Sequence, residues 1–476
     1  MAMGTREKER QKPLWVSASM ARSPGHPFYE GLNRILDEAG FDEFAEQQCA
    51  PFYAERMGRP SLAPAVYFRL QLIGYFEGID SERGIAWRVA DSLALREFLG
   101  YELQQRTPDH STISRNRRLI DLETHREVFI WVLRVLAEEG LLEGKTLGVD
   151  STTLEANAAL RSIVRRDSGE SYEEFLTKLA QESGIETPTR QDLAKLDRKR
   201  KGKGSNEDWT NPHDPDATIT KMKDGRTHLA HKAEHVVDMK SGAVVAVAVS
   251  SAIAGDTQTV QGALQQAVEN LVGVSEKEAA AERLADPLVM ELVVMELVAD
   301  KGYHSNQVLT DLQELGIRSY ISEPDRGKRN WKGKAAEKKA TYGNRRRIRR
   351  AKGQALQRRR GEVLERNHAH CYGRGRTRRM HLRGHPNINK RLFIHVAGCN
   401  LGLVMRHLYG AGTPKGLQGL AVAVNTPLQR LLKPLNSLLA LVPRFVTRYD
   451  PLPSGGALSF ILLVPHRLKP TSATAC

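Results

Sequence analysis

The sequence contains few cysteines. Its four cysteines lie far apart in the chain with no CxxC spacing, at Cys49, Cys371, Cys399 and Cys476. This pattern predicts neither a disulfide framework nor a standard zinc knuckle. Grouping two of these cysteines with His381 and His385 also matches no usual zinc-finger spacing. We therefore expect a protein of the reducing cytoplasm that holds no structural zinc.

Long apolar segments are also missing. The N-terminal stretch MAMGTREKERQK is charged and leads into no apolar run, which argues against a secretory signal. The longest apolar stretches near the C-terminus, such as Leu458 to Val464, are too short to span a bilayer. We therefore expect no membrane contact.

Acidic residues are almost absent from one segment. Residues 326–360 contain sixteen Lys or Arg and a single acid, Glu337, so this segment carries the whole formal charge of +15. Such a focused positive charge favours a polyanionic partner, because Lys and Arg supply most of the sequence-independent affinity for DNA phosphates. The densest part of the segment offers five candidate phosphate contacts: Arg345, Arg346, Arg347, Arg349 and Arg350.

A chain of 476 residues is too long for one ordinary core, so we expect two or three structural units. Apolar residues at helical spacing, as in REVFIWVLRVLAEEGLL, predict a helical region that ends near Gly140. We expect a flexible N-terminus, an all-helical N-terminal domain, an α/β domain and a C-terminal tail, at 1–27, 28–142, 143–410 and 411–476. The polar stretch of about 165–220 shows little periodicity, and we expect it to add no core.

The α/β domain is predicted from alternating patterns. KTLGVD reads as a strand that ends at Asp150, and THLAHKAEHVVD, MKSG and AVVAVAVSS read as a hairpin. A helix over 257–272, an apolar run that ends at Asp300, the helix SNQVLTDLQELG and the strand IRSYIS follow. This alternation predicts an α/β layer with a mixed sheet.

Two acids at the tips of separate strands suit a shared magnesium site, since hard divalent cations take oxygen ligands from a few carboxylates. Asp150 and Asp300 are these acids, and a third should come from a later helix. The helix GQALQRRRGEVLERNHAH offers Glu362 and Glu365. These residues are one turn apart, and helix geometry alone does not choose between them.

Candidate DNA contacts lie outside the basic segment as well. The stretch DHSTISRNRRLI predicts a short helix capped by Asp109, with Arg115, Arg117 and Arg118 on it. This helix has the outline of a helix-turn-helix recognition element, and a solvated basic face is an equal alternative. In the hairpin, Lys232 is a candidate phosphate contact, and a structural role is about as well supported.

Several blocks of sequence resemble, in order, the DDE transposases of bacterial insertion sequences. The blocks are FRLQLIGYFEGIDSERGIAWRVADSLALREFLGY, TPDHSTISRNRRLID, VDSTTLEANAA, KMKDGRTHLAHKAEHVVD, VADKGYHS, GIRSYISEPDRGKRNWKG, RRRGEVLER and HLRGHPNINKRLFIHVAGCNLGLVMR. They extend from about residue 50 to 410. Their joint occurrence is far more specific than any single block.

The resemblance implies an RNase H-like core with Asp150 on its first strand, Asp300 on its fourth and Glu365 on a following helix. It implies that these three acids hold two Mg²⁺ ions, with Mn²⁺ able to substitute. The family pattern selects the glutamate that is followed by Arg366. The sequence departs from that pattern just beyond, where Asn367, His368 and Tyr372 stand in place of a small, an aromatic and a basic residue.

The expected function is metal-dependent excision and strand transfer of an insertion sequence. The expected partners are double-stranded DNA, the terminal inverted repeats, the target DNA and a second copy of the chain in a homodimer. The helical domain would bind the DNA ends, and the protein would be cytoplasmic and associated with the nucleoid when bound to DNA. A nuclease without strand transfer and a decayed, non-catalytic DNA-binding derivative are the alternatives.

Overall fold

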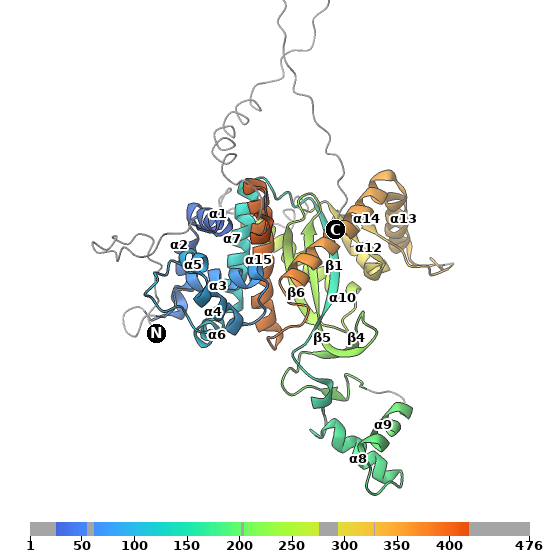
Figure 1. Cartoon of the computed structure of the whole chain (residues 1–476). Helices are drawn as coiled ribbons and strands as arrows, with labels where there is room; N and C mark the ends of the chain where they lie inside the picture. Colours follow the sequence, from blue (N-terminus) through green and yellow to red (C-terminus); the bar gives the residue numbers. More distant parts are fainter. Residues whose placement is uncertain (1–24, 55–60, 201–203, 276–293, 328, 418–476) are drawn as a thin grey trace, which may run out of the picture. The chain divides into compact units, whose positions relative to one another are not determined.

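The structure is a computed structural model, and it describes residues 25–54, 61–200, 204–275, 294–327 and 329–417. Its N-terminal part is helical and most of the remainder is built around one mixed sheet (Figure 1). The expected flexible N-terminus lies outside the described residues except for 25–27, and the expected C-terminal tail does so except for 411–417. Within the described part, no helix is both apolar and long enough to cross a membrane.

The N-terminal region confirms the expected helices. They are α1 (Pro27–Glu38), α2 (Phe41–Cys49), α3 (Pro64–Glu77), α4 (Glu82–Asp91), α5 (Leu93–Phe98), α6 (His110–Leu119) and α7 (Leu122–Glu138), with a short turn η1 (Ala50–Phe52) after α2. Ser81, Ser92, Asp109 and Asp121 begin four of them, and each side chain accepts a hydrogen bond from a backbone N–H in the first turn. Apart from Glu77, all residues of α3 are buried, which places this helix in the centre of the group.

The main sheet is mixed, as the alternating pattern predicts. Its strands are β1 (Thr146–Glu155), β4 (Thr218–Lys221), β5 (Thr227–Asp238), β6 (Val244–Ser251), β7 (Glu296–Ala299) and β8 (Arg318–Ile321). β5 pairs antiparallel with β4, β6 and β1, whereas β7 pairs parallel with both β1 and β8. The predicted hairpin is therefore confirmed as β5 and β6.

The prediction that the first strand ends at Asp150 is wrong. β1 continues to Glu155 because β5 pairs with it along its length, from Leu147 to Glu155. The parallel partner β7 pairs only with 146–148. Asp150 therefore lies inside a strand, just beyond the point where the strand loses its parallel neighbour.

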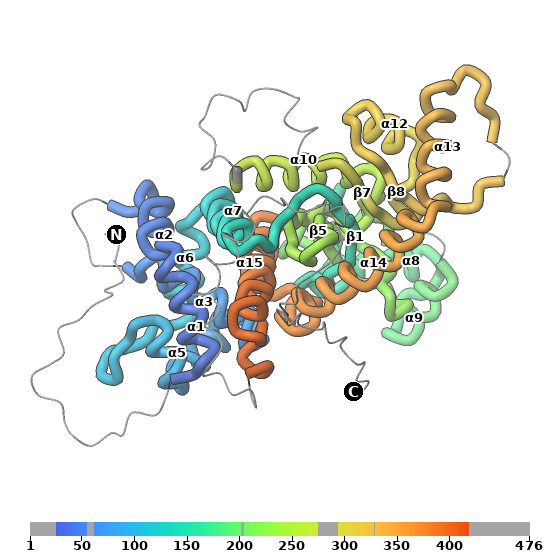
Figure 2. Tube along the Cα trace, turned by 90° about the horizontal axis from the view of Figure 1, so that it is seen from above, coloured from blue at the N-terminus to red at the C-terminus, as the bar shows by residue number. Residues whose placement is uncertain are grey.

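Helices cover both faces of this sheet. Side chains alternate between the faces, and Leu147, Val149 and Leu297 pack with α10 (Asp256–Ser275) and α12 (Asn306–Glu314). The opposite face packs against α14 (Ala351–His368) and α15 (His385–Tyr409). Figure 2 shows α10 and α14 on opposite sides of β1 and β5. α13 (Ala335–Arg349) packs on α12 and β8. A short 3-10 helix, η3 (Lys301–Tyr303), follows β7, and a π-helix, η4 (Ala369–Arg374), follows α14.

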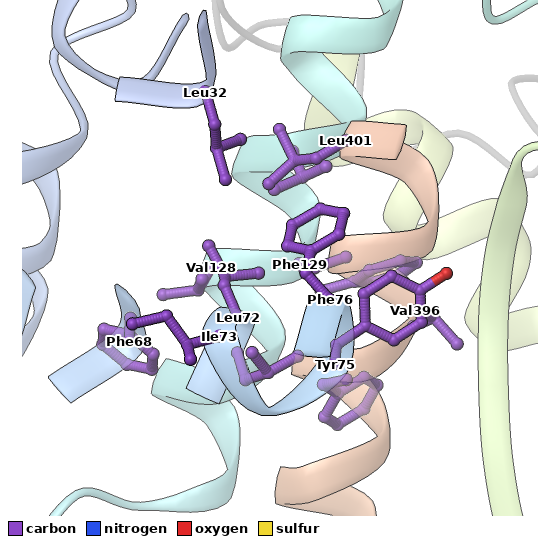
Figure 3. Close-up of a cluster of buried hydrophobic side chains, with 14 of the residues drawn as sticks. Leu32, Phe68, Leu72, Ile73, Tyr75, Phe76, Val128, Phe129, Val396 and Leu401 are labelled. Carbon is purple, nitrogen blue, oxygen red and sulfur yellow. The ribbon is translucent and has the colours of Figure 1, made fainter. Parts of the chain in front are cut away.

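The hydrophobic core crosses the expected domain boundary at 142/143. α15 packs against α3 and α7, so Val396 and Leu401 lie in one cluster with Leu72, Phe76 and Phe129 (Figure 3). The same cluster reaches the sheet through Val244 and Val247 of β6 and others. The boundary is therefore a change in secondary structure within one continuous core.

The expectation that residues of about 165–220 add no core is wrong. Together with the residues just before it, this stretch forms η2 (Leu160–Ser162), β2 (Val164–Arg165), α8 (Tyr172–Glu182), α9 (Arg190–Lys199) and β3 (Trp209–Thr210). Trp209 is only 2% exposed and lies edge-on to Tyr172 and Phe175. Tyr172 and Phe175 precede Trp209 by more than thirty residues, so local periodicity in the sequence cannot predict the cluster that the three residues form.

Candidate active site

The sheet register brings Asp150 and Asp300 together. Gly148 pairs with Val298 across the parallel strands β1 and β7, and each aspartate lies two residues beyond its member of that pair. Side chains two residues apart along extended backbone point to the same face. The two carboxylates therefore lie side by side where the parallel pairing of β1 and β7 ends.

Short hydrogen bonds orient both aspartates. Asp300 caps η3, where its Oδ1 accepts a hydrogen bond from the backbone N–H of Gly302 at 2.7 Å. Oδ1 of Asp150 accepts one from the N–H of Ser151 at 2.9 Å. These contacts use one oxygen of each carboxylate.

The surroundings of Asp150 make its negative charge unfavourable unless a positive charge lies nearby. Burial raises the pKa of this carboxyl, and the neighbouring charge of Asp300 raises it further, whereas Arg360 and Lys223 lower it. Nη1 of Arg360, on α14, lies 3.5 Å from Oδ2 of Asp150. Two adjacent carboxylates that repel one another form a donor set that fits a hard divalent cation.

The two candidate glutamates lie about 60° apart on the same outward side of α14, and both are exposed. Measured from Arg360, at about 100° per residue, Glu365 lies roughly 140° one way and Glu362 roughly 160° the other, so both are turned away from the residue that contacts Asp150. Glu362 forms an ion pair with Arg366 and lines a small cavity beside Gly242, in the turn between β5 and β6.

That turn lies at the end of the sheet opposite to the aspartates. The N–H of Met239, where the turn begins, donates to the carbonyl of Thr146 at the start of β1. Glu362 therefore lies beside the end of the sheet opposite to the aspartates, and the choice of Glu365 as the third acid rests on the resemblance. Among the described residues, Glu365 does not join Asp150 and Asp300 in a group of acids that could hold a metal ion.

Across the residues that the structure describes, no three His, Cys, Asp or Glu side chains are arranged to hold a metal ion. The structure thus brings together two of the three acids. The cysteine and histidine set does not form one group either: Cys371 and Cys399 contact each other, whereas His381 forms an ion pair with Asp80 and His385 packs against His231. Cys371 is buried beside Asn367.

Lys232 is buried, not presented to solvent. It is 4% exposed, and its ammonium forms an ion pair with Asp256 at 2.7 Å. It also donates to the hydroxyl of Thr259 at 2.9 Å and to the carbonyl of Ala254 at 3.2 Å. These contacts fit the structural alternative for this lysine better than a phosphate contact.

The three arginines of α6 are placed differently. Arg115 and Arg118 are exposed, whereas Arg117 is buried and donates to Glu82 at 2.7 Å and to Asn387 at 2.6 Å. Arg117 therefore anchors α6 to α4 and α15. Only the other two arginines present a guanidinium that DNA can reach.

The basic segment divides in the same way. Arg345 makes two hydrogen bonds with Glu323, and Arg347 donates to the carbonyl and hydroxyl of Ser319 at 2.9 and 2.8 Å. Of the five candidate arginines, three are exposed and have no ion pair among the described residues: Arg346, Arg349 and Arg350. They form an accessible basic surface where α13 ends and α14 begins.

The positions that depart from the family pattern pack together. The side chain of Asn367 lies 3.2 Å from Nδ1 of His235, and the hydroxyl of Tyr372 is hydrogen bonded to Nε2 of the same ring. His368 lies against that ring too. His235 is the β5 partner of Asp150, so the departures form a buried contact beside the candidate site, on the same face of the sheet.

Two residues near the site were not singled out from the sequence. Arg360 belongs to a run of basic residues that the sequence does not distinguish from one another. Only the packing of α14 shows that Arg360 contacts Asp150. Asp256 begins α10 and accepts a hydrogen bond from the hydroxyl of Ser151 at 3.0 Å. An acid in the first turn of a helix is so common that its sequence context carries little signal.

Residues 17–119 match the family model described as "Transposase domain (DUF772)", and the match ends where α6 ends. No curated protein and no solved structure matches the chain. The family match supports a transposase, a protein that acts on DNA.

Proposed function

We propose that this protein is a DDE transposase that excises an insertion sequence and joins it to target DNA. The observation that carries this proposal is the register of β1 and β7, which sets Asp150 and Asp300 side by side. The exposed arginines where α13 meets α14 supply a phosphate-binding surface on the same catalytic region. The N-terminal match to a transposase domain supports the same activity.

An RNase H-like core is part of this proposal. The resemblance implies that the first acid lies on the first strand and the second acid on the fourth. Counted along the chain without the short edge strand β4, the strands of the main sheet are β1, β5, β6, β7 and β8. Asp150 then lies on the first strand, and Asp300 directly follows the fourth. The antiparallel β6, β5 and β1 followed by the parallel β7 and β8 support this assignment.

Asp150 and Asp300, with Glu365 from α14, would hold the Mg²⁺ or Mn²⁺ ions. Two such ions bound together activate an attacking oxygen and stabilise a leaving oxygen in phosphoryl transfer. The chain itself would position the DNA backbone, and Arg360 would neutralise the phosphate beside Asp150. Because two element ends must be held in one complex, the active species would be a homodimer on the terminal inverted repeats.

The test is cleavage of DNA that carries the element's ends, which we expect in Mg²⁺ or Mn²⁺ but not in Ca²⁺, whose looser coordination suits binding better than in-line displacement. Strand transfer from a pre-cleaved end would separate a transposase from a nuclease on the same scaffold. Full cleavage in excess chelator would rule out the metal mechanism. End binding without cleavage in any metal would favour the decayed, non-catalytic derivative.

The exposed arginines should divide into two functional groups. Replacing Arg346, Arg349 and Arg350 by glutamine should weaken binding to all DNA sequences alike, because phosphate contacts carry no base information. The salt dependence of binding, as log Kd against log salt, should flatten by about 0.9 for each phosphate that the protein no longer neutralises. Replacing Arg115 and Arg118 should instead reduce the preference for terminal repeats over unrelated DNA.

The measurement is a salt titration of DNA binding with both kinds of DNA. Arg345→Gln is the matched control within the basic segment, because its guanidinium is already bonded to Glu323. We expect that variant to change the salt slope less than any one of the exposed arginines does. Identical behaviour of the two groups would contradict the division.

A further inference from the structure

A polar network lies directly behind the two aspartates, on the sheet face that α10 covers. It is built by Lys232 and Glu234 of β5, Asp256 and Thr259 of α10, Ser151 of β1 and Tyr303 of η3. Lys232, Glu234 and Tyr303 are at most 4% exposed. Charged groups buried this deeply require partners, and here each one has several.

Asp256 contacts both segments that carry the aspartates. Its Oδ1 accepts a hydrogen bond from the hydroxyl of Ser151, the neighbour of Asp150, and lies 2.7 Å from the ammonium of Lys232. Its Oδ2 lies against Gly302, two residues after Asp300. A Cβ on Gly302 would lie 2.3 Å from this oxygen and 3.0 Å from Oδ1 of Asp300, so only glycine allows the approach.

A second connection fixes η3 to the sheet. The hydroxyl of Tyr303 donates to Glu234 at 2.7 Å, and the hydroxyl of Thr259 donates to the same oxygen at 3.0 Å. Glu234 is paired with Ser151 in the register of β5 and β1. The turn after Asp300 and the strand of Asp150 are therefore held against one frame.

We propose that Lys232 and Asp256 are positioning residues whose ion pair sets the spacing between Asp150 and Asp300. Lys232 neutralises Asp256, so that this third carboxylate can lie between the two segments without repelling Asp300. The inference rests on the proposed function, since it assigns a role toward the metal ligands. It also gives Lys232 a role other than phosphate binding.

The test measures Mn²⁺ binding to the full chain without DNA, by the loss of the free-ion signal in electron paramagnetic resonance. We expect Asp256→Asn to weaken Mn²⁺ binding about 10- to 100-fold, the range typical of groups that orient metal ligands. Ser151→Ala should weaken it less. Glu269→Gln is the matched control, because it removes a paired carboxylate from the same helix at a distance from the network.

The double variant Lys232→Met, Asp256→Asn separates positioning from ligation. If the ion pair acts by charge balance, removing both charges should restore much of the affinity that either single change loses. A double variant no better than Asp256→Asn would make Asp256 a direct ligand and overturn the proposal. DNA binding provides the second readout: a weaker, flatter salt dependence in Lys232→Met with unchanged Mn²⁺ affinity would make Lys232 a phosphate contact and also overturn it.

Asp150→Asn shows which hypothesis fails. If Asp150→Asn leaves Mn²⁺ affinity unchanged, the metal site of the proposed function is itself wrong. If Asp150→Asn weakens binding and Asp256→Asn does not, only the positioning role is wrong. Should Lys232→Met fail to fold, Asp256→Asn and Ser151→Ala still decide the question, because they keep the size of the side chain or shorten it by one atom.

Discussion

Replacing Asp150 by asparagine is expected to abolish DNA cleavage and to leave DNA binding unchanged. Asparagine keeps the size of the side chain but removes the negative charge that a divalent cation needs. A catalytic metal supplies several kcal/mol of transition-state stabilisation. At about 1.4 kcal/mol for each tenfold change in rate, we expect cleavage to fall by about 10³-fold.

The same substitution should not destabilise the fold. Burial and the charge of Asp300 raise the pKa of Asp150, so the folded protein holds this carboxylate at a cost. Asparagine removes that cost, and the midpoint of thermal unfolding should stay the same or rise. A residue retained for stability would show the opposite result.

The measurements are single-turnover cleavage, DNA binding and thermal unfolding of the same preparations. Asp208→Asn is a matched control, because Asp208 is an exposed aspartate in the insertion and not near the site. It should leave all three quantities unchanged. An Asp150→Asn protein that cleaves DNA at the normal rate would remove this residue from the catalytic centre.

Glu365→Gln should reduce cleavage as strongly as Asp150→Asn, whereas Glu362→Gln should retain most activity. The resemblance assigns the third acid to Glu365, whereas Glu362 is paired with Arg366 beside the turn between β5 and β6. Both changes remove one negative charge from one helix without changing side-chain size. A difference between them therefore reports position and not helix stability.

Cleavage and end binding are measured for both variants at several Mg²⁺ concentrations. For Glu365→Gln, binding of the DNA ends should survive while turnover is lost at every concentration. An inactive Glu362→Gln beside an active Glu365→Gln would assign the third acid to the wrong residue. Loss of activity in both would point to the helix as a whole.

The sequence alone predicted most of the elements around Asp150 and Asp300, and it nominated these two aspartates as metal ligands. The hairpin, α6 with its Asp109 cap, α14 and the apolar run into Asp300 each depend on local periodicity and on capping side chains. The joint order of the blocks that resemble DDE transposases added the candidate function. Such signals are local in the chain, which is why they can be read without coordinates.

Local patterns were misleading where distant segments pair. The strand through Asp150 is longer than its pattern indicates because β5 extends it, and the polar insertion has a small core because Trp209 meets Tyr172 and Phe175. The apolar residues of this insertion are too sparse to form a period. Only contacts between distant positions show that they are buried.

The tertiary structure alone decided which charged side chains are available. Arginines and lysines that look equivalent in the sequence separate into buried anchors, such as Lys232 and Arg117, and exposed groups, such as Arg115 and Arg346. The difference arises because a buried cation must find fixed partners from other elements, and those partners are brought to it only by folding. The composition gives the number of charged side chains, whereas the packing determines which of them are exposed and can contact DNA.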